Sequence, residues 1–192
     1  KTVEYTHYFD NIRQTDGSAF NNLLERPEGI DFEDPAYDPM LDAFNDFGGF
    51  PDGMISSSVI DNPGPDAVNG SSKVGTITQV DVIGWAGVAI QTLLDAPVDW
   101  SKGRMISMDV WSPVAGQEHQ IKLENVDNSM NVEKRATSTI AEGWETLTFD
   151  FTDAQPEDLV KVVLMLNVDG DKTVEYTHHF DNIRQHNYWR FN

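Results

Sequence analysis

The residues best suited to bind a ligand fall on two predicted strands in the middle of the chain. Alternation turns every second residue of the segments 106–111 and 120–124 away from the core, and these outward residues are Ser107, Asp109, Trp111, Gln120, Lys122 and Glu124. We expect the two strands to be neighbours. An aromatic ring beside such polar groups can hold a sugar by stacking and hydrogen bonds, and Trp85 could add a second ring.

Two other interpretations of these residues stay open. Trp85 and Trp111 fit equally well as covers over the core, and polar residues are usual on the outer face of a β-sandwich. The segment 44–53 holds three phenylalanines among glycines, so it is a competing position for a binding site.

Catalytic patterns are missing from the sequence. It contains no nucleophile elbow, no HExxH motif and no phosphate-binding glycine loop. Paired carboxylates such as Glu142 and Glu145 fall at predicted turns, without the spacing that a glycosidase needs on one strand face. His178 and His179 are adjacent, so on a strand they point to opposite faces and cannot bind one metal together. We therefore expect a protein that is not an enzyme.

Charge limits the possible partners. The 192 residues include 32 acidic and 13 basic side chains, a formal net charge of −19. Such a surface repels phosphate backbones and anionic lipids, so we expect neither nucleic-acid binding nor membrane insertion. Cysteine is absent, which excludes disulfides and zinc–thiolate sites. The sequence starts at Lys1 without a signal peptide, so we expect an excised or mature piece of a protein.

The elements that would position these residues are short strands. We predict strands at 73–80, 85–93, 103–112, 119–126, 131–139, 144–151, 160–168 and 173–184, and a short one at 29–32. Residues 51–72 are rich in Gly, Pro, Asn, Asp and Ser, which predicts turns. Strands at roughly ten-residue spacing without a helical period predict an all-β fold, an antiparallel β-sandwich (jelly roll) of eight or nine strands.

One fourteen-residue segment of the sequence occurs twice. Residues 1–14 and 172–185 are identical at thirteen of fourteen positions and differ only at Tyr8 and His179. We interpret 1–14 as the last strand of a preceding tandem module, followed by a linker at 15–28 and the module itself at 29–185, with a tail at 186–192. The first copy is either an unpaired remnant or a strand that pairs with another molecule, which would allow self-association through residues 1–14.

Several motifs in order resemble a known family. They are IDFED (30–34), VIDNPGPDAVNGSSKVG (59–75), GWAGVAIQ (84–91), the run 94–129, GWETLTFDF (143–151) and HFDNIR (179–184). Together they resemble the calcium-binding jelly-roll carbohydrate-binding modules (galactose-binding-like, family-4-type) of secreted bacterial polysaccharide-degrading proteins. The resemblance implies an extracellular module that binds a neutral glycan such as a β-glucan, xylan or mannan and has no catalysis of its own.

The same resemblance implies a structural calcium ion. In such modules the ion lies where the Phe-Glu-Asp of the first strand meets the Phe-Asp of the last. The matching residues here are Glu33, Asp34 and Asp181, with Asp31 nearby. Calcium takes six to eight oxygen ligands, so a few carboxylates completed by backbone carbonyls suffice. The other interpretation is an acidic surface on an acidic protein.

Two functions follow from these observations. The first is a non-catalytic β-sandwich module, stabilised by calcium, that binds a neutral polysaccharide, with a β-glucan-type glycan favoured. The alternative is a structural or adhesive tandem-repeat module that assembles into fibres by exchanging the duplicated strand.

Overall fold

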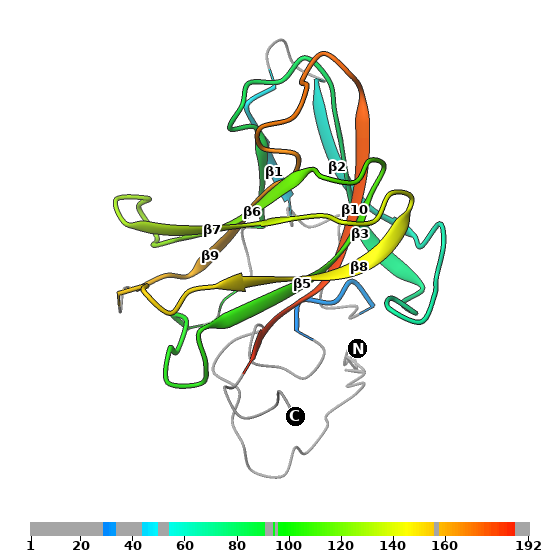
Figure 1. Ribbon diagram of the computed structural model, residues 1–192. Helices are drawn as coiled ribbons and strands as arrows, with labels where there is room; N and C mark the ends of the chain where they lie inside the picture. Colours follow the sequence, from blue (N-terminus) through cyan, green and yellow to red (C-terminus); the bar gives the residue numbers. More distant parts are fainter. Residues whose placement is uncertain are drawn as a thin grey trace, which may run out of the picture.

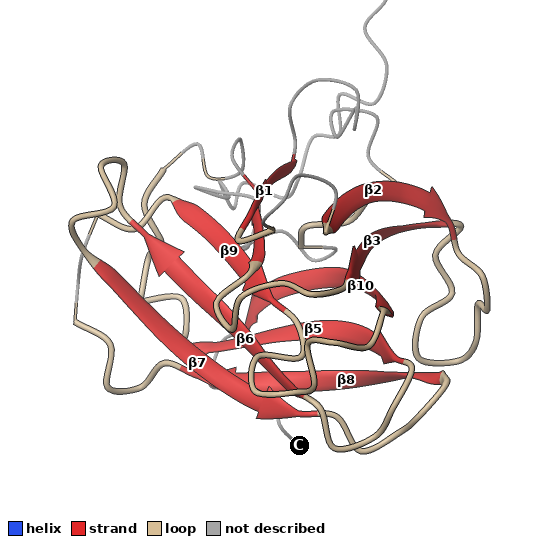
Figure 2. Cartoon of the chain, turned by 90° about the horizontal axis from the view of Figure 1, so that it is seen from above, coloured by secondary structure: helices blue, strands red, loops and turns tan. Residues whose placement is uncertain are grey.

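Two antiparallel sheets of five strands each pack face to face (Figure 1 and Figure 2). The computed structural model describes residues 29–33, 44–49, 54–90, 94, 96–155 and 158–186. The predicted terminal strand 1–14, the linker 15–28 and the tail from residue 187 onward lie outside the described residues. Within the described ranges every regular element is a strand, and no helix could span a membrane.

The first sheet has the strand order β1-β4-β9-β6-β7. Its strands are β1 (Phe44–Phe47), β4 (Gly87–Ile90), β9 (Lys161–Met165), β6 (Glu118–Glu124) and β7 (Asn131–Thr137). The second sheet has the order β2-β3-β10-β5-β8. Its strands are β2 (Ile55–Asp61), β3 (Lys73–Gln79), β10 (Tyr176–His186), β5 (Met105–Ser112) and β8 (Gly143–Asp150). Figure 1 shows the two layers one above the other, with β6 and β7 in the upper one and β5 and β8 in the lower, and Figure 2 looks down on them.

The predicted antiparallel β-sandwich is confirmed, with ten strands rather than eight or nine. The two additional strands are β1 and β2, which fall in segments that composition assigns to a loop and to turns. The predicted strand at 29–32 is instead a single bridge between Ile30 and Ile183. The last strand continues to His186, one residue beyond the predicted end of the module.

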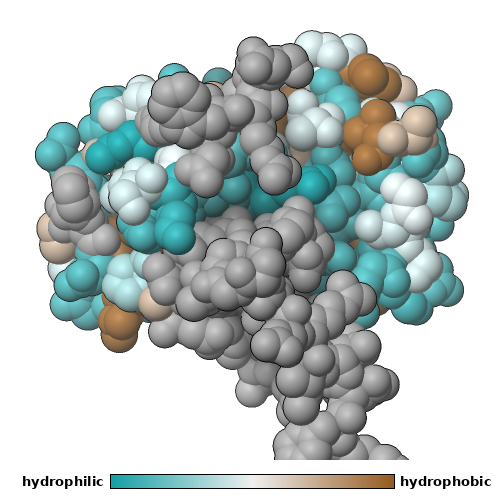
Figure 3. All heavy atoms as spheres, turned by 90° about the horizontal axis from the view of Figure 1, so that it is seen from below, coloured by the Kyte–Doolittle hydropathy of each residue, from teal (hydrophilic) through white to brown (hydrophobic). Residues whose placement is uncertain are grey.

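The core between the sheets is built from the alternate residues that face inward. Fully buried examples are Ile77, Met108, Ile121, Phe149 and Phe180, each from a different strand. Burying such a side chain stabilises a fold by about 1.5–3 kcal/mol, so a core of this size needs no disulfide. The coloured surface in Figure 3 is mostly hydrophilic, with hydrophobic side chains in small separate groups.

Strand β10 is the central element of its sheet. It pairs with β3 on one side and β5 on the other, as Figure 1 shows. The pairing with β5 shifts between Asp181 and Arg184, where Asn182 has a φ of 50°. Asparagine tolerates this left-handed backbone better than most residues, so a β-bulge can form here. The bulge changes the direction in which the side chains after it point.

Candidate functional site

A polar row lies on the outer face of the first sheet. Gln120, Lys122 and Glu124 of β6 alternate with the core residues Ile121 and Leu123. The Lys122 ammonium lies 2.7 Å from a Glu124 carboxylate oxygen. The row is therefore held in place by its own contacts.

Strand β7 extends this row toward the edge of the sheet. Register places Arg135 opposite Gln120 and Glu133 opposite Lys122. Arg135 Nε donates a hydrogen bond to Gln120 Oε1 at 2.7 Å, and Gln120 Nε2 donates to Glu133 Oε2 at 3.2 Å. Amide, guanidinium and carboxylate groups thus meet on one surface, which provides both donors and acceptors.

An apolar strip continues the same face toward β1. Met165 and Val163 of β9 are the register partners of Gln120 and Lys122, so their side chains share this face. They form a small cluster separate from the main core, with Val168 and, packed against it, Phe47 and Ala89. The prediction from sequence missed this strip.

Trp85 lies at the end of the strip, in the turn before β4. Its side chain is 57% exposed. The indole stacks on Phe47, with ring centroids 6.0 Å apart and planes 19° apart. A large aromatic ring that is supported from one side and open on the other suits stacking against a sugar ring. Trp85, the apolar strip and the polar row lie on one side of the sheet, which we call the β6 face. Val163, Met165 and Gln120 are buried within it, whereas Trp85 is exposed and Lys122 and Glu124 are partly exposed.

The predicted residues Asp109 and Trp111 lie elsewhere. They belong to β5 in the second sheet, so the prediction that segments 106–111 and 120–124 are neighbouring strands is wrong. The connection 113–117 crosses from one sheet to the other, which puts the outward side chains of β5 and β6 on opposite sides of the molecule.

Asp109 is 1% exposed and its two carboxylate oxygens are already bonded. Thr146 Oγ1 donates to Oδ1 at 2.6 Å, and Asn182 Nδ2 donates to Oδ2 at 2.9 Å. Burial raises the pKa of Asp109, while these two hydrogen bonds oppose the rise. Trp111 is half-buried against the ring of His179, at 5.1 Å between centroids. These contacts fit a structural role for Asp109 and Trp111.

Of the predicted calcium ligands, Asp31 and Glu33 lie in the segment 29–33, which meets β10 at the bridge between Ile30 and Ile183, and Asp181 lies in β10. Asp181 is fully buried and accepts a hydrogen bond from Asn69 Nδ2 at 2.9 Å, whereas its Oδ1 has no partner among the described residues. Burial raises the pKa of Asp181 to about 6, the polar groups of Ser71 and Asn69 oppose the rise, and the charge of Asp31 adds to it.

Glu33 is held by a different set of groups. Its carboxylate accepts hydrogen bonds from Ser72 Oγ and from the backbone N–H of Lys73. Burial raises the pKa of Glu33, but these bonds prevail and leave it below its usual value. Asp34 lies outside the described residues. Across the described ranges, His, Cys, Asp and Glu side chains form no group of three that could hold a metal by themselves.

Comparison with solved structures places this fold among those of carbohydrate-binding modules. An exo-β-agarase matches with a TM-score of 0.56 and 13% identity, over 82% of this chain and 24% of its own. The family 11 carbohydrate-binding module of a Clostridium thermocellum cellulosomal cellulase matches with a TM-score of 0.50 and 15% identity, over 76% of this chain and 88% of the module.

A third match is a fragment of the Clostridium thermocellum endo-1,4-β-D-xylanase 10B that joins a family 22 carbohydrate-binding module to its GH10 module. It has a TM-score of 0.51 and 11% identity, over 88% of this chain and 29% of its own. This chain therefore spans about a quarter of the agarase and of the xylanase fragment. No family model and no curated protein matches the sequence. The expected resemblance to jelly-roll carbohydrate-binding modules is confirmed in the fold.

Proposed function

We propose that this chain is a non-catalytic, extracellular module that binds a neutral polysaccharide on the β6 face. The observation that carries the proposal is the exposed Trp85 stacked on Phe47 at one end of that face. From there the apolar strip leads across β9 to the polar row of β6 and β7. A glycan chain would lie across these strands, with one sugar ring on the indole and hydroxyls toward the accessible side chains of Lys122, Glu133 and Arg135.

Charge favours a neutral glycan. On the β6 face the charges of Lys122 and Arg135 are balanced by those of Glu124 and Glu133, and the chain as a whole has a formal charge of −19, so an acidic polysaccharide would be repelled. A β-glucan is our preferred ligand. One structure with this fold is the family 11 module in complex with a β-1,3-1,4-mixed-linked tetrasaccharide, and the xylanase fragment was solved with xylohexaose. Both ligands are uncharged and suggest which glycans to test first.

Affinity electrophoresis tests this function. The protein runs in native gels that contain mixed-linkage β-glucan, xylan, mannan, agarose or the acidic control polygalacturonate. We expect retardation by at least one neutral glycan and none by the acidic one. Retardation by none of the neutral glycans would overturn the proposal. Release of reducing ends from a retained glycan would instead indicate an enzyme.

A structural calcium ion is part of this proposal. The unpartnered Oδ1 of buried Asp181 and the nearby charge of Asp31 are what a bound cation would satisfy. The residues that would hold it are Asp181 and Asp31, with Glu33 and Asp34 as further predicted ligands and backbone carbonyls completing the set. Calcium would supply charge compensation between β10 and the segment 29–33, and so stabilise the fold.

The alternative function is fibre assembly through the duplicated sequence. Residues 5–14 match Tyr176–Gln185 of β10 at every position except 179. A strand of that sequence from another molecule could therefore pair with β3 and β5 as β10 does. It would also place the same side chains in the core, including the equivalents of Phe180 and Ile183. Light scattering over a concentration series tests this. Assembly that disappears on deletion of residues 1–14 would support exchange, and a monomer at all concentrations would exclude it.

A further inference from the structure

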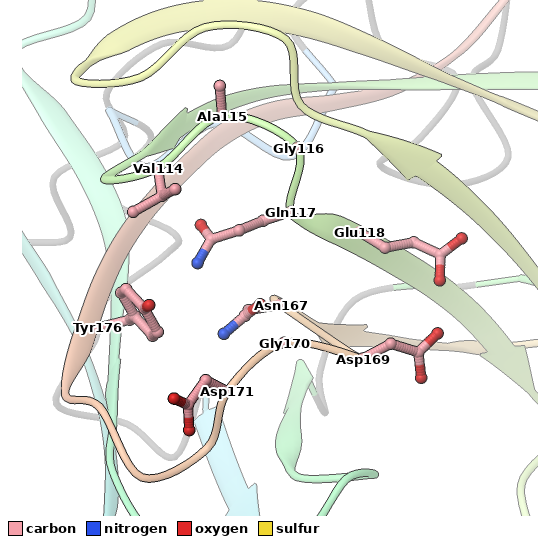
Figure 4. Close-up of a pocket in the computed structure, with 10 residues that line it drawn as sticks. All are labelled: Val114, Ala115, Gly116, Gln117, Glu118, Asn167, Asp169, Gly170, Asp171 and Tyr176. Atoms are coloured by element: carbon pink, nitrogen blue, oxygen red, sulfur yellow. The ribbon is translucent and has the colours of Figure 1, made fainter.

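A pocket of about 270 Å³ lies at one end of the sandwich, next to the end of the β6 face that holds Arg135 (Figure 4). Its walls are the segment 114–118 before and at the start of β6, the segment 167–171 after β9, and Tyr176 at the start of β10. None of the residues that form the β6 face lines this pocket. It is therefore a separate candidate site.

Asn167 supplies the strongest sign that the pocket takes a ligand. The residue is fully buried, and neither Oδ1 nor Nδ2 of its side chain has a hydrogen-bond partner among the described residues. Its backbone has a φ of 54°, a left-handed conformation that asparagine tolerates. A Cβ on Gly170 would lie 1.7 Å from Asn167 Oδ1, so only glycine at position 170 leaves room for this amide. A buried amide without partners is unusual, because such groups are nearly always hydrogen-bonded.

The side-chain amide of Gln117 also indicates that the pocket takes a ligand. Gln117 Oε1 lies 2.9 Å from His178 Nε2, and since the amide oxygen can only accept, the imidazole must donate. Burial lowers the pKa of His178 well below its usual value, which keeps the ring neutral, and the bond to Gln117 then places its proton on Nε2. The amide nitrogen of Gln117 is then directed elsewhere. Figure 4 shows the side-chain nitrogens of Gln117 and Asn167 pointing into the same space, with the ring of Tyr176 across from them.

The charged residues of the pocket exclude anions. Glu118 and Asp169 turn away from it and pair with Arg135 at 2.9 and 2.8 Å. Asp171 lies at the rim, where its Oδ1 accepts hydrogen bonds from Thr173. The amide nitrogens of Gln117 and Asn167 can only donate, which disfavours a cation. The ligand that fits is therefore neutral, accepts hydrogen bonds from two amides, donates one to Asn167 Oδ1, and lays an apolar face on Tyr176.

We propose that this end pocket binds a single neutral sugar ring, either a free monosaccharide or the terminal unit of a glycan. Its volume lies just below the range of about 300–1,000 Å³ that is typical of small-molecule pockets, which suits one ring rather than an extended chain. The proposal stands independently of the β6 face.

The test follows the side-chain NH₂ signals of Gln117 and Asn167 by NMR in ¹⁵N-labelled protein. The probes are D-glucose, D-galactose, D-mannose and D-xylose at up to about 10 mM, ten times a Kd of about 1 mM, and then oligosaccharides that end in each sugar. We expect saturable shifts of both signals with at least one probe. Response to a free sugar identifies a monosaccharide site, and response to oligosaccharides alone identifies a chain-end site.

Two matched variants locate the binding. Val114 is 44% exposed, and Figure 4 shows its side chain directed into the pocket, so Val114→Trp should fill the space and weaken binding at least tenfold. Val126→Trp makes the same change at a 74% exposed position outside the pocket and should leave binding intact, as should Trp85→Ala. The proposal is overturned if no probe gives a saturable shift, if Val114→Trp binds as the unmodified protein does, or if Trp85→Ala abolishes the shifts.

Discussion

Trp85 and Phe47 lie nearly parallel, with ring centroids 6.0 Å apart and planes 19° apart. Phe47 packs against the buried cluster of Val163, Met165 and Val168, and so supports the indole from the protein side. Trp85 nevertheless remains 57% exposed. An exposed ring that is held in one orientation loses little conformational freedom when a ligand stacks on it, which favours binding.

Replacing Trp85 by alanine should abolish glycan retention. Stacking and burial of an aromatic ring are worth about 1.5–3 kcal/mol, which corresponds to a loss of affinity of about tenfold to a hundredfold. Affinity electrophoresis measures the loss, and thermal unfolding checks that the fold is intact. Trp111→Ala is the matched control on the opposite face and should bind normally. Loss of retention in Trp111→Ala alone would place the site on β5 instead.

Asp181 should make the calcium-free protein less stable as the pH rises. Its pKa in the folded protein is raised from 3.8 to about 6, so its contribution is fully present below about pH 4 and is lost as the pH rises through 6. The rise corresponds to about 3 kcal/mol at most. Urea unfolding with chelator from about pH 4 to pH 7 measures it.

Calcium should remove this loss, because it binds the ionised carboxylate. Asp181→Asn keeps an acceptor for the amide of Asn69 and has no charge to titrate, so it should lose both the dependence on pH and the stabilisation by calcium. An equal stabilisation by calcium in Asp181→Asn and in the unmodified protein would exclude Asp181 as a ligand.

His119 should make the protein less stable as the pH falls. Burial lowers its pKa to about 4, so its contribution to stability is fully present above pH 6.5 and is lost as the pH falls through 4. The backbone N–H of Asn167 donates to Nδ1, so the ring donates through Nε2 to Ser112, and protonation of Nδ1 would break the first bond.

His119→Gln removes the titrating ring. We expect the acid loss of unfolding free energy to shrink by up to about 3 kcal/mol, while the share that belongs to His178 remains. Urea unfolding in the Asp181→Asn background, which has no carboxyl group to titrate at that position, is the appropriate measurement. An unchanged acid slope in His119→Gln would contradict the assignment.

Gly75→Ala should destabilise the sandwich. A Cβ at this position of β3 would lie 2.5 Å from the ring of Phe180 in the core. Overpacking of this kind typically costs about 1–3 kcal/mol. Gly64→Ala is the matched control, because its Cβ would meet nothing within 4 Å, and it should change stability by less than about 0.5 kcal/mol. Equal midpoints of urea unfolding for the two variants would contradict the packing described here.

The fold class could be read from the sequence because strand alternation and turn composition are local signals. Strand β2 was missed because its sequence ISSSVID has three serines and lies between turn-rich segments. Its period of two was nevertheless present, with Ile55 buried and Ser56 and Ser58 exposed.

The pairing of strands is not a local signal, and for this reason the prediction that the segments 106–111 and 120–124 are neighbouring strands was wrong. Successive strands are often neighbours, but the connection after Ser112 crosses to the other sheet, so β5 and β6 face opposite ways. Four of the predicted residues do lie on one face, namely Trp85, Gln120, Lys122 and Glu124. The apolar strip beside them comes from β9, whose sequence KVVLM is hydrophobic on both sides and so does not reveal which face each residue occupies.

The most direct test of the account follows the indole N–H signals of Trp85 and Trp111 by NMR while a mixed-linkage β-glucan tetrasaccharide is added. The two rings lie on opposite faces, so they report on the two possible sites within one sample. The account predicts a saturable shift of the Trp85 signal and an unchanged Trp111 signal. A shift of Trp111 with Trp85 unchanged would contradict the assignment of the β6 face.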